Sequence, residues 1–393
     1  MSHPEKVFIG SSVHNWNDPR VLHKQACSLA GYYAVELHVP ADFQYKNFNG
    51  VEIYGLPEWE KKIHRVKIIF ILAKRIIAHR GPIVHLHDPE LLPLGFIVKL
   101  VTSKKVIFDF HEQYENKILK RDWIPQILRK PLSYCYVVLE RIACRVFDGV
   151  IGVIEDQVDL LSENLNYCIV KNYPIIETDT VVQIEKENGE NFKLIYMGDI
   201  TRERRIHRLI EATFRLSEKF NVSLHLIGGI GDPGYDKELQ CVISRYNLDE
   251  KVTVHGYLPI NEAMELVKSS DVGFLPLRHP KHFVRSLPVK LFDYMSAGIP
   301  VIMPEYPLSR NVIVKYKCGL LVDSLDMEDI VTKVEYLIQH PQEKVRMGVN
   351  GRQAIQAHFS WQSQESILLK FYHSVININT RKKSVNSDKR HRL

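Results

Sequence analysis

The sequence of 393 residues has few cysteines, and they lack the spacings that give cysteine a metal-binding role. The six cysteines are scattered, with no C-x-x-C pair and no short spacing to histidine that would suit zinc. This usage fits a protein kept in a reducing cytoplasm and gives no support to a zinc site.

Targeting signals and long apolar runs are also missing. The first residues, MSHPEK, lack the basic-then-apolar pattern of a secretory signal and lead directly into an expected strand. The most apolar helix candidate, residues 68–78, is interrupted by Lys74 and Arg75, and no stretch reaches the length of a membrane span. We therefore expect a cytoplasmic protein.

The chain has no large excess of charge of one sign. The formal net charge is +6, and part of it lies in RKKSVNSDKRHRL, so residues 378–393 are expected to form a disordered basic tail. No zinc finger, RNP-type strand or strongly basic helix predicts nucleic-acid binding. A nicotinamide-cofactor fingerprint is absent as well, because the first strand is followed by GSSVHNWNDPR and not by G-x-G-x-x-G.

The sequence does contain short apolar runs that alternate with helical patterns, twice over. This alternation predicts an α/β fold with two doubly wound parallel-sheet domains. The expected strands are 6–10, 33–39, 83–88, 105–112, 149–155 and 168–172, and then 193–198, 223–229, 252–256, 272–277 and 300–304. The expected helices are 19–29, 58–79, 89–101, 131–147, 204–219, 234–246, 261–269, 326–340, 342–358 and 361–375.

An acidic, polar segment near the middle predicts the domain boundary. The expected parts are an N-terminal domain at 1–176, a linker at 177–191 and a C-terminal domain at 192–358. A helix at 359–377 and the basic tail follow. Because open parallel sheets bind ligands beyond the carboxyl ends of their strands, the residues after each strand are the candidates for function.

In the first half, two neighbouring strands end in an imidazole and a carboxylate. His87 and Asp88 follow one strand, and His111 and Glu112 follow the next. Such groups can orient hydroxyls or transfer protons near neutral pH. A capped helix start beside hydrogen-bonded histidines is the simpler explanation for HLHDP. The spacing matches no metal-binding pattern, and no metal site is predicted.

In the second half, three segments suit a phosphate. Arg204 and Arg205 lie close to a helix start, where acids are usually preferred, which indicates an anion nearby. Gly228 and Gly229 form a loop after a strand, although a simple turn explains them equally well. The entry SLPVK, residues 286–290, predicts a helix start whose free N–H groups could receive an anion.

In their order and spacing, these segments resemble the retaining glycosyltransferases of family 4, which have the two-Rossmann architecture called GT-B. The pieces, which span residues 7–372, are NDPRVLHKQACSLA, HLHDPELLPLG, FDFHE, KNYP, YMGDITRERRIHRLIEA, VTVHGYLP, SLPVKLFDYMSAGIPVI and FSW. The P-x-K-L-F-[ED]-Y form resembles bacterial surface-polysaccharide enzymes. The resemblance implies two domains facing across a cleft, with the C-terminal helix crossing back to the N-terminal domain.

The resemblance also implies an activity. A sugar would pass from a nucleoside diphosphate sugar to a glycan or lipid-linked acceptor, with retained anomeric configuration and with no metal or other cofactor. Arg204 would hold the donor diphosphate, with Arg205 a close competitor, and His111 would lie near the donor sugar. Asp293 would bind the donor ribose, and Lys290 would add positive charge. The remaining donor-side candidates are Ser286, Leu287, Pro288, Val289, Gly228 and Gly229.

On the acceptor side the candidates are His87, Asp88 and Glu112. The basic and apolar segments 64–80 and 125–138 could rest on an anionic membrane at the inner face of the plasma membrane, although packing against the sheet also explains them. The sequence does not indicate an oligomeric state.

Two departures from the family pattern keep alternatives open. Arg285 stands where the family has a first glutamate, and Asp199 stands where an arginine often occurs; Lys290, Arg202 or Arg205 could supply that charge. The alternatives are a nucleotide-sugar epimerase on the same fold and a non-catalytic glycan- or nucleotide-binding subunit. A third alternative, a metal-dependent hydrolase, would use His85, His87, Asp88, His111 and Glu112.

Overall fold

The computed structural model describes residues 5–59, 64–110, 114–119, 124–153, 166–176, 191–277 and 287–390. For residues 116, 117 and 378–390 it describes the main chain alone. The chain divides into two compact units, which are treated separately below. Unit 1 is Met1–Asn172 together with Trp361–Leu393, and unit 2 is Tyr173–Ser360. The predicted linker at 177–191 lies outside the described residues except for Asn191, so that boundary stays a prediction.

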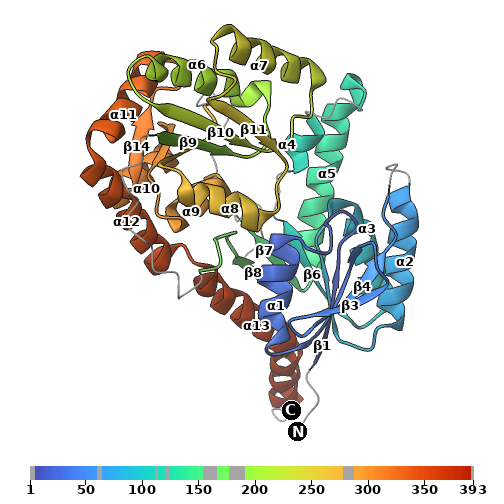
Figure 1. Cartoon of the computed structure of the whole chain (residues 1–393). Coiled ribbons are helices and arrows are strands. Elements are labelled where there is room, and N and C mark those ends of the chain that lie inside the picture. The colour runs from blue at the N-terminus through green and yellow to red at the C-terminus, as the bar shows by residue number, and fades with distance from the viewer. Residues whose placement is uncertain are drawn as a thin grey trace. The chain divides into compact units, whose positions relative to one another are not determined.

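Unit 1 is built on an eight-stranded sheet in the order β3-β4-β2-β1-β5-β6-β7-β8 (Figure 1). The strands are β1 (Lys6–Gly10), β2 (Ala34–Pro40), β3 (Tyr45–Phe48), β4 (Val51–Leu56), β5 (Ile83–Leu86), β6 (Lys105–Phe110), β7 (Gly149–Gly152) and β8 (Tyr167–Ile169). All pairs are parallel except β3 with β4. The six predicted strands are present, with shifted ends.

The hairpin of β3 and β4 was not predicted, and it makes this sheet mixed. Its two-residue turn is Asn49-Gly50, with φ of 48° and 82°. Positive φ at both central residues is what the tight turn of a right-twisted hairpin requires, and Asn-Gly satisfies it at low cost. The Asn-Gly pair in FNGVE was thus a turn signal in the sequence. The hairpin was still not predicted, because its first strand, Tyr45–Phe48, is short and polar.

Helices cover both faces of this sheet. They are η1 (Pro19–Ala26), α1 (Cys27–Ala30), α2 (His64–Ala78), η2 (Pro89–Leu91), α3 (Leu92–Val101), α4 (Tyr114–Leu119), α5 (Gln126–Val146) and α13 (Trp361–Arg390). Successive strand residues point to opposite faces. Accordingly, Val7 and Ile9 join the core under η1, α1 and α13, whereas Phe8 joins the core under α2, α3 and α5.

The last helix, α13, returns the chain to unit 1 and is longer than predicted. It runs through most of the segment 378–393 that was expected to be a disordered tail. The segment Trp361–Arg390 contains neither glycine nor proline, so nothing in it breaks a helix. The Trp361 indole donates to Ser28 Oγ at 2.9 Å, and Lys105 Nζ donates to the carbonyls of Val375 and Ile376.

Unit 2 contains a six-stranded, all-parallel sheet in the order β11-β10-β9-β12-β13-β14. The strands are β9 (Phe192–Met197), β10 (Val222–Ile227), β11 (Val252–Gly256), β12 (Val272–Phe274), β13 (Val301–Pro304) and β14 (Gly319–Val322). The helices are η4 (Arg202–Arg204), α6 (Ile206–Ser217), α7 (Pro233–Arg245), α8 (Ile260–Ser269), α9 (Val289–Ser296), α10 (Pro307–Tyr316), α11 (Met327–Gln339) and α12 (Pro341–His358). β14 and α10 were not predicted.

Helix α9 is held against the sheet of unit 2 by a buried tyrosine. The Tyr294 hydroxyl accepts from the Met197 N–H at 2.8 Å and donates to the Phe274 carbonyl at 3.1 Å, which ties α9 to the ends of β9 and β12. Gly273 makes room for the ring, because a Cβ there would lie 2.6 Å from it. No helix in the described part of either unit is long and apolar enough to cross a bilayer.

We predict that Gly273→Ala lowers the free energy of unfolding of unit 2 by about 1–3 kcal/mol, because the added methyl group displaces the Tyr294 ring. Gly231→Ala is the matched control, since its Cβ would meet nothing within 4 Å. Amide hydrogen exchange in peptides of β12 and α9 measures the effect. Equal exchange in Gly273→Ala and Gly231→Ala would show that Gly273 does not position α9.

Candidate functional site

The order of the strands in unit 2 locates a binding site. β9 is followed along the chain by β10 on one side, and β12 lies on its other side, so the order reverses between β9 and β12. In open parallel sheets ligands bind beyond the carboxyl ends of the strands at such a reversal. Residues 198–205 form the loop after β9, and α9 is the first described helix after β12. The structure does not describe residues 278–286, which include Arg285 and Ser286.

Two glycines allow the loops after β9 and β10 to lie against each other. Gly198 and Gly228 both have φ of 148°, which favours glycine. A Cβ on Gly228 would lie 2.0 Å from the Gly198 carbonyl oxygen. The Ile200 N–H donates to the Gly229 carbonyl at 3.0 Å, and Ile200 and Ile230 form a bridge. The two loops therefore form one layer of main chain at the edge of the sheet.

Arg204 is fixed at this edge by contacts to the end of β9. Its Nη1 donates to the Tyr196 hydroxyl at 3.2 Å, and that hydroxyl donates to the Asp199 carbonyl at 2.9 Å. Its Nη2 contacts Asp199 Oδ2 at 3.2 Å. Arg204 Nε is buried and has no hydrogen-bond partner among the described residues. Because Asp199 is 76% exposed and Arg204 only 23%, an anion can replace the aspartate without moving the guanidinium far.

The neighbouring arginines lie in other surroundings. Arg202 contacts Glu238 and lies within 4.0 Å of Asp232, and its guanidinium is 4.9 Å from the centre of the Tyr235 ring. These contacts hold Arg202 against α7 and neutralise it. Arg205 has φ of 54° between η4 and α6, a left-handed conformation that is uncommon outside glycine.

Helix α9 begins without a side-chain cap among the described residues. Pro288 is its N-cap residue, and Val289 is the first helical residue. Lys290 Nζ lies 3.1 Å from Asp293 Oδ2, one turn along the same helix. The helix start thus combines a positive dipole end with a lysine. Leu287, also a predicted donor-side residue, packs against the core beneath α9.

In unit 1, the predicted residue Asp88 organises a loop from inside the protein. It is fully buried, and its Oδ2 accepts from Ser11 Oγ at 2.7 Å, from the Ser12 N–H at 2.6 Å and from the Val13 N–H at 3.2 Å. The Ser12 hydroxyl donates to the same oxygen at 3.3 Å, so donors from three successive residues converge on one carboxylate and shape the turn after β1. His111 and Glu112 lie outside the described residues.

That turn leads to a second carboxylate, which begins η1. Asp18 Oδ1 accepts from the N–H groups of Arg20 and Val21, and Asp18 Oδ2 pairs with His14 Nδ1 at 3.0 Å. Burial raises the pKa of Asp18, but the His14 contact and the two N–H donors together lower the pKa below its usual value. His14 Nε2 lies 3.6 Å from Asp88 Oδ1, so His14 bridges the two acids.

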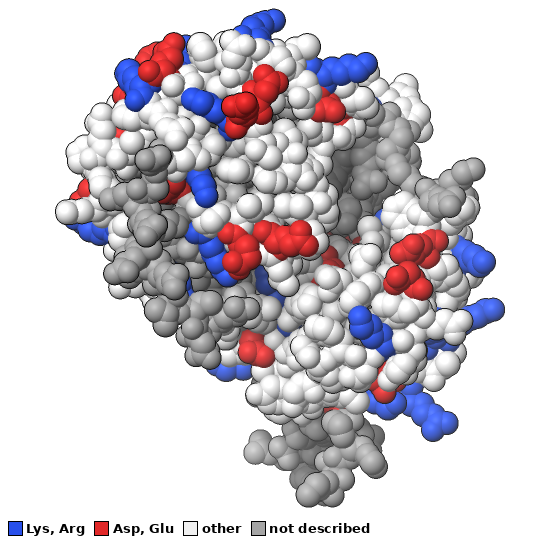
Figure 2. All heavy atoms as spheres, viewed as in Figure 1, with Lys and Arg blue, Asp and Glu red and all other residues white. Residues whose placement is uncertain are grey.

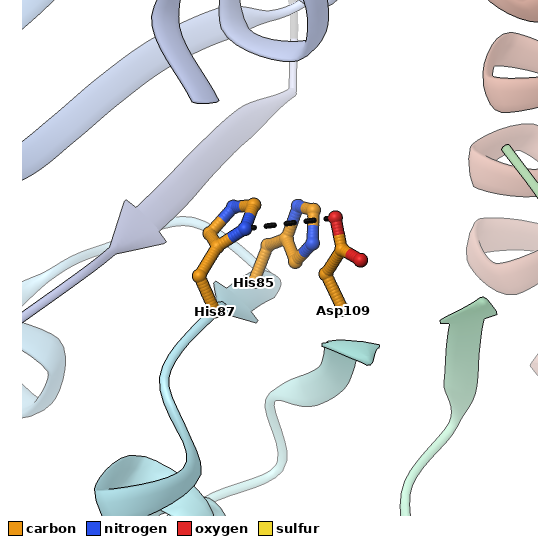
Figure 3. Close-up of side chains that lie close together, drawn as sticks. All are labelled: His85, His87 and Asp109. Atoms are coloured by element: carbon orange, nitrogen blue, oxygen red, sulfur yellow. Dashed lines mark ion pairs between the residues drawn. The ribbon is translucent and has the colours of Figure 1, made fainter. Parts of the chain in front are cut away.

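His87 joins a buried polar network that includes a residue not predicted, Asp109. Both oxygens of Asp109 accept from Arg20, at 3.0 and 3.1 Å, and Oδ2 also accepts from Gln25 at 2.6 Å. His87 Nδ1 lies 3.6 Å from Asp109 Oδ2 (Figure 3). The His85 and His87 rings lie side by side with centres 4.3 Å apart. His85 Nδ1 pairs with the Tyr372 hydroxyl of α13 at 2.7 Å.

The ligand atoms of His85, His87 and Asp109 lie within 4.8 Å of one another, a spacing that could hold a metal ion. Two observations oppose that role. Arg20 and Gln25 already occupy the Asp109 oxygens, and a guanidinium 3.0 Å from a carboxylate oxygen repels a second cation. The contacts fit an internal network that ties η1, β5, β6 and α13 together.

Sequence reasoning assigned no role to Asp109, Arg20 or Asp18, although the quoted segments NDPRVLHKQACSLA and FDFHE contain them. A signal for Asp109 was available, because VIFDF places one carboxylate among apolar strand residues, and a buried charge needs a partner. The partner, Arg20, lies 89 residues away in the chain. No spacing rule could have paired them.

A match to a family model falls within unit 2, and other similarities span nearly the whole chain. Residues 177–354 match the family described as "Glycosyl transferases group 1". The chain is 22% identical to an MMP alpha-(1->4)-mannosyltransferase of Mycolicibacterium hassiacum over 96% of this chain and 91% of that protein. It is 25% identical to a putative colanic acid biosynthesis glycosyltransferase, WcaL, of Salmonella typhimurium over 43% of this chain; that match spans less than half of WcaL, 44%.

Solved structures share the architecture. A sucrose-phosphate synthase from Thermosynechococcus elongatus has a TM-score of 0.71 at 16% identity and covers 94% of this chain and 98% of that chain. HepE of Anabaena, solved with UDP-glucose, has a TM-score of 0.69 at 15% identity and covers 95% of this chain and 100% of that chain. The predicted GT-B fold is confirmed by these structural neighbours.

We predict that Asp109→Asn lowers the free energy of unfolding of unit 1 by about 3–5 kcal/mol, because Arg20 loses its counter-ion in the interior. Tryptophan fluorescence in a urea titration measures this directly, since Trp16, Trp59, Trp123 and Trp361 all belong to unit 1.

The matched control is Glu328→Gln, which removes one of the two carboxylates that pair with Arg215 at the surface. Exposed pairs contribute about 0–1 kcal/mol, so this variant should unfold like the wild type. If Asp109→Asn also unfolded like the wild type, the network would not be a structural element of unit 1.

Proposed function

We propose that this protein is a retaining glycosyltransferase that moves a sugar from a nucleoside diphosphate sugar to a glycan or lipid-linked acceptor. The relative named for mannosyl transfer supports sugar transfer, and the relative named for colanic acid biosynthesis supports a role in polysaccharide biosynthesis. The observation that carries the proposal is the edge of unit 2, inside the matched family segment. Arg204, in the loop after β9, has a buried Nε with no hydrogen-bond partner among the described residues. Helix α9, the first described helix after β12, begins without a side-chain cap in the described part.

These groups would bind and activate the donor. The Arg204 guanidinium and the N–H groups of Val289 and Lys290 would hold the diphosphate, and they would stabilise the charge that develops on it as the bond to the sugar breaks. A preorganised donor of this kind typically contributes about 2.7–4 kcal/mol to the transition state. Asp293, 15% exposed and paired with Lys290, would accept hydrogen bonds from the ribose hydroxyls.

The bond changes follow from retention of configuration. The bond from the anomeric carbon to the phosphate oxygen breaks, and a bond to the acceptor hydroxyl forms on the same face of the sugar. The proton of that hydroxyl passes to the departing phosphate oxygen, which is the nearest base on that face. In this scheme His111, although outside the described residues, would contact the sugar rather than remove the proton.

We predict that Arg204→Ala weakens binding of a nucleoside diphosphate roughly 10- to 100-fold, because a charged hydrogen bond is lost. UDP is the first nucleotide to test, since HepE was solved with a UDP-sugar. Isothermal titration calorimetry of the full chain measures the effect. Arg202→Ala is the matched control, and it should bind like the wild type because Arg202 is already held by Glu238 and Tyr235.

Two results would count against the proposal. One is a panel of nucleoside diphosphates in which none binds the wild-type chain. The other is an Arg202→Ala variant that binds more weakly than Arg204→Ala. Conversion of the donor in the absence of acceptor would indicate an epimerase instead, and tight donor binding without transfer to any acceptor would indicate a non-catalytic subunit.

We predict that sugar transfer needs no metal ion, because arginine, lysine and helix N–H groups would supply the positive charge. Transfer measured after dialysis against EDTA should therefore equal transfer before it, with the metal content of the dialysed protein measured in parallel. Loss of transfer that one divalent cation restores would contradict this and would redirect attention to His85, His87 and Asp109.

A further inference from the structure

Three neighbouring helices of unit 1 expose large apolar side chains to solvent. α3 packs between α2 and α5 on one face of the sheet. On α3, Leu100 is 84% exposed and Val101 63% exposed, and Ile97 lies one turn away on the same side. On α2, Phe70 and Ile77 are more than 60% exposed. Helices that cover a sheet normally present polar side chains outward, so this surface is unusual.

α5 continues the same surface. Leu128, Leu132, Leu139, Ile142 and Val146 are exposed, and their spacing of three, four or seven residues places them along one side of the helix. The buried residues Ser133, Tyr136, Ala143 and Cys144 face the core, roughly a third of a turn around the helix from these exposed residues. α5 therefore carries an exposed apolar stripe beside its buried one.

The charges on these helices are almost all positive. α2, α3 and α5 together carry nine lysines and arginines and a single acid, Glu140. Lys67, Lys74, Lys130, Arg141 and Arg145 form no ion pair with any residue that the structure describes. In Figure 2, lysine and arginine side chains project from the right-hand edge of the molecule, where α2 lies in Figure 1.

The one acidic residue on these helices, Glu140, has a raised pKa. Burial, and then the nearby charge of Glu115, raise the pKa of Glu140 to about 7. At neutral pH this carboxyl is ionised only in part, so it offsets little of the positive charge around it.

We propose that the exposed sides of α2, α3 and α5, here called the α2–α3–α5 face, bind the surface of an anionic lipid bilayer. Apolar side chains of a surface-lying helix enter the boundary between headgroups and acyl chains, and lysines and arginines beside them contact anionic headgroups. A second copy of the chain fits less well, because pairing two such faces would bring their unpaired cations together. The inference does not depend on the proposed glycosyl transfer, although it would place a lipid-linked acceptor near the protein.

Vesicle binding tests the proposal. The full chain is sedimented with vesicles of phosphatidylglycerol and phosphatidylcholine, and separately with vesicles of phosphatidylcholine alone. We expect binding to the anionic vesicles and much weaker binding to the neutral ones. Binding should also fall between 0.1 M and 1 M salt, because the screening length shortens from about 10 Å to about 3 Å.

Matched variants locate the surface. Arg141→Gln with Arg145→Gln should weaken binding to anionic vesicles roughly 30-fold, since each cation near such a membrane contributes about 1 kcal/mol. The control is Lys237→Gln with Arg245→Gln, which removes two exposed cations from α7 in unit 2. Leu100→Ser should weaken binding about tenfold, and Val314→Ser, an exposed position on α10, should not change it.

Several outcomes would overturn the proposal. One is no binding to anionic vesicles, and another is equal loss in the α5 and α7 variants. A third is a wild-type dimer in sedimentation equilibrium that Leu139→Ser converts to monomer, which would assign the face to a second copy. Nucleotide binding, measured on the same variants, should match the wild type; this keeps a failure of membrane binding distinct from a failure of the proposed function.

Discussion

A parallel sheet covered by helices on both faces leaves its interior no access to solvent, so polar chemistry is confined to the strand ends. Both units obey this constraint. In unit 2 the main chain after β9 and β10 is drawn into one layer because Gly228 lies against the Gly198 carbonyl, which no side chain would allow. That close approach brings Arg204 and the loop around it to the edge of the sheet, and it is the feature on which the proposed donor site depends.

The two units use their strand ends differently. In unit 2 the groups at the edge are cations and the N–H groups at the start of α9, which no described side chain caps, with an exposed aspartate beside Arg204 that an anion can replace. In unit 1 the strand-end charges are turned inward and satisfied, Asp88 by the loop after β1 and Asp109 by Arg20. Buried charges of this kind stabilise little by themselves, but removing one partner is costly, so they specify one arrangement of η1, β6 and α13.

The sequence was sufficient for most of the fold and for part of the site. Apolar runs such as KLIYM predicted the parallel strands, because a strand buried on both faces must be apolar throughout. The hairpin at Asn49-Gly50 and the strand Gly319–Val322 were missed, since short elements carry little periodicity. For the candidate site, the local signals around Arg204 and Pro288 could be recognised. The pairing of Arg20 with Asp109 could not, because it depends on the register between segments 89 residues apart.

The α2–α3–α5 face is the exception to the rule that a covering helix is polar outside. Leu100, Val101 and Phe70 lie in water, although burying each side chain would stabilise the fold by roughly 1.5–3 kcal/mol. Surface substitutions by polar residues cost a folded protein little, so such a face is not required by the fold. The same helices carry a single acidic residue, and packing against the sheet explains neither property. A partner that is apolar within and anionic at its surface explains both, which is the reason for proposing a bilayer rather than a second protein.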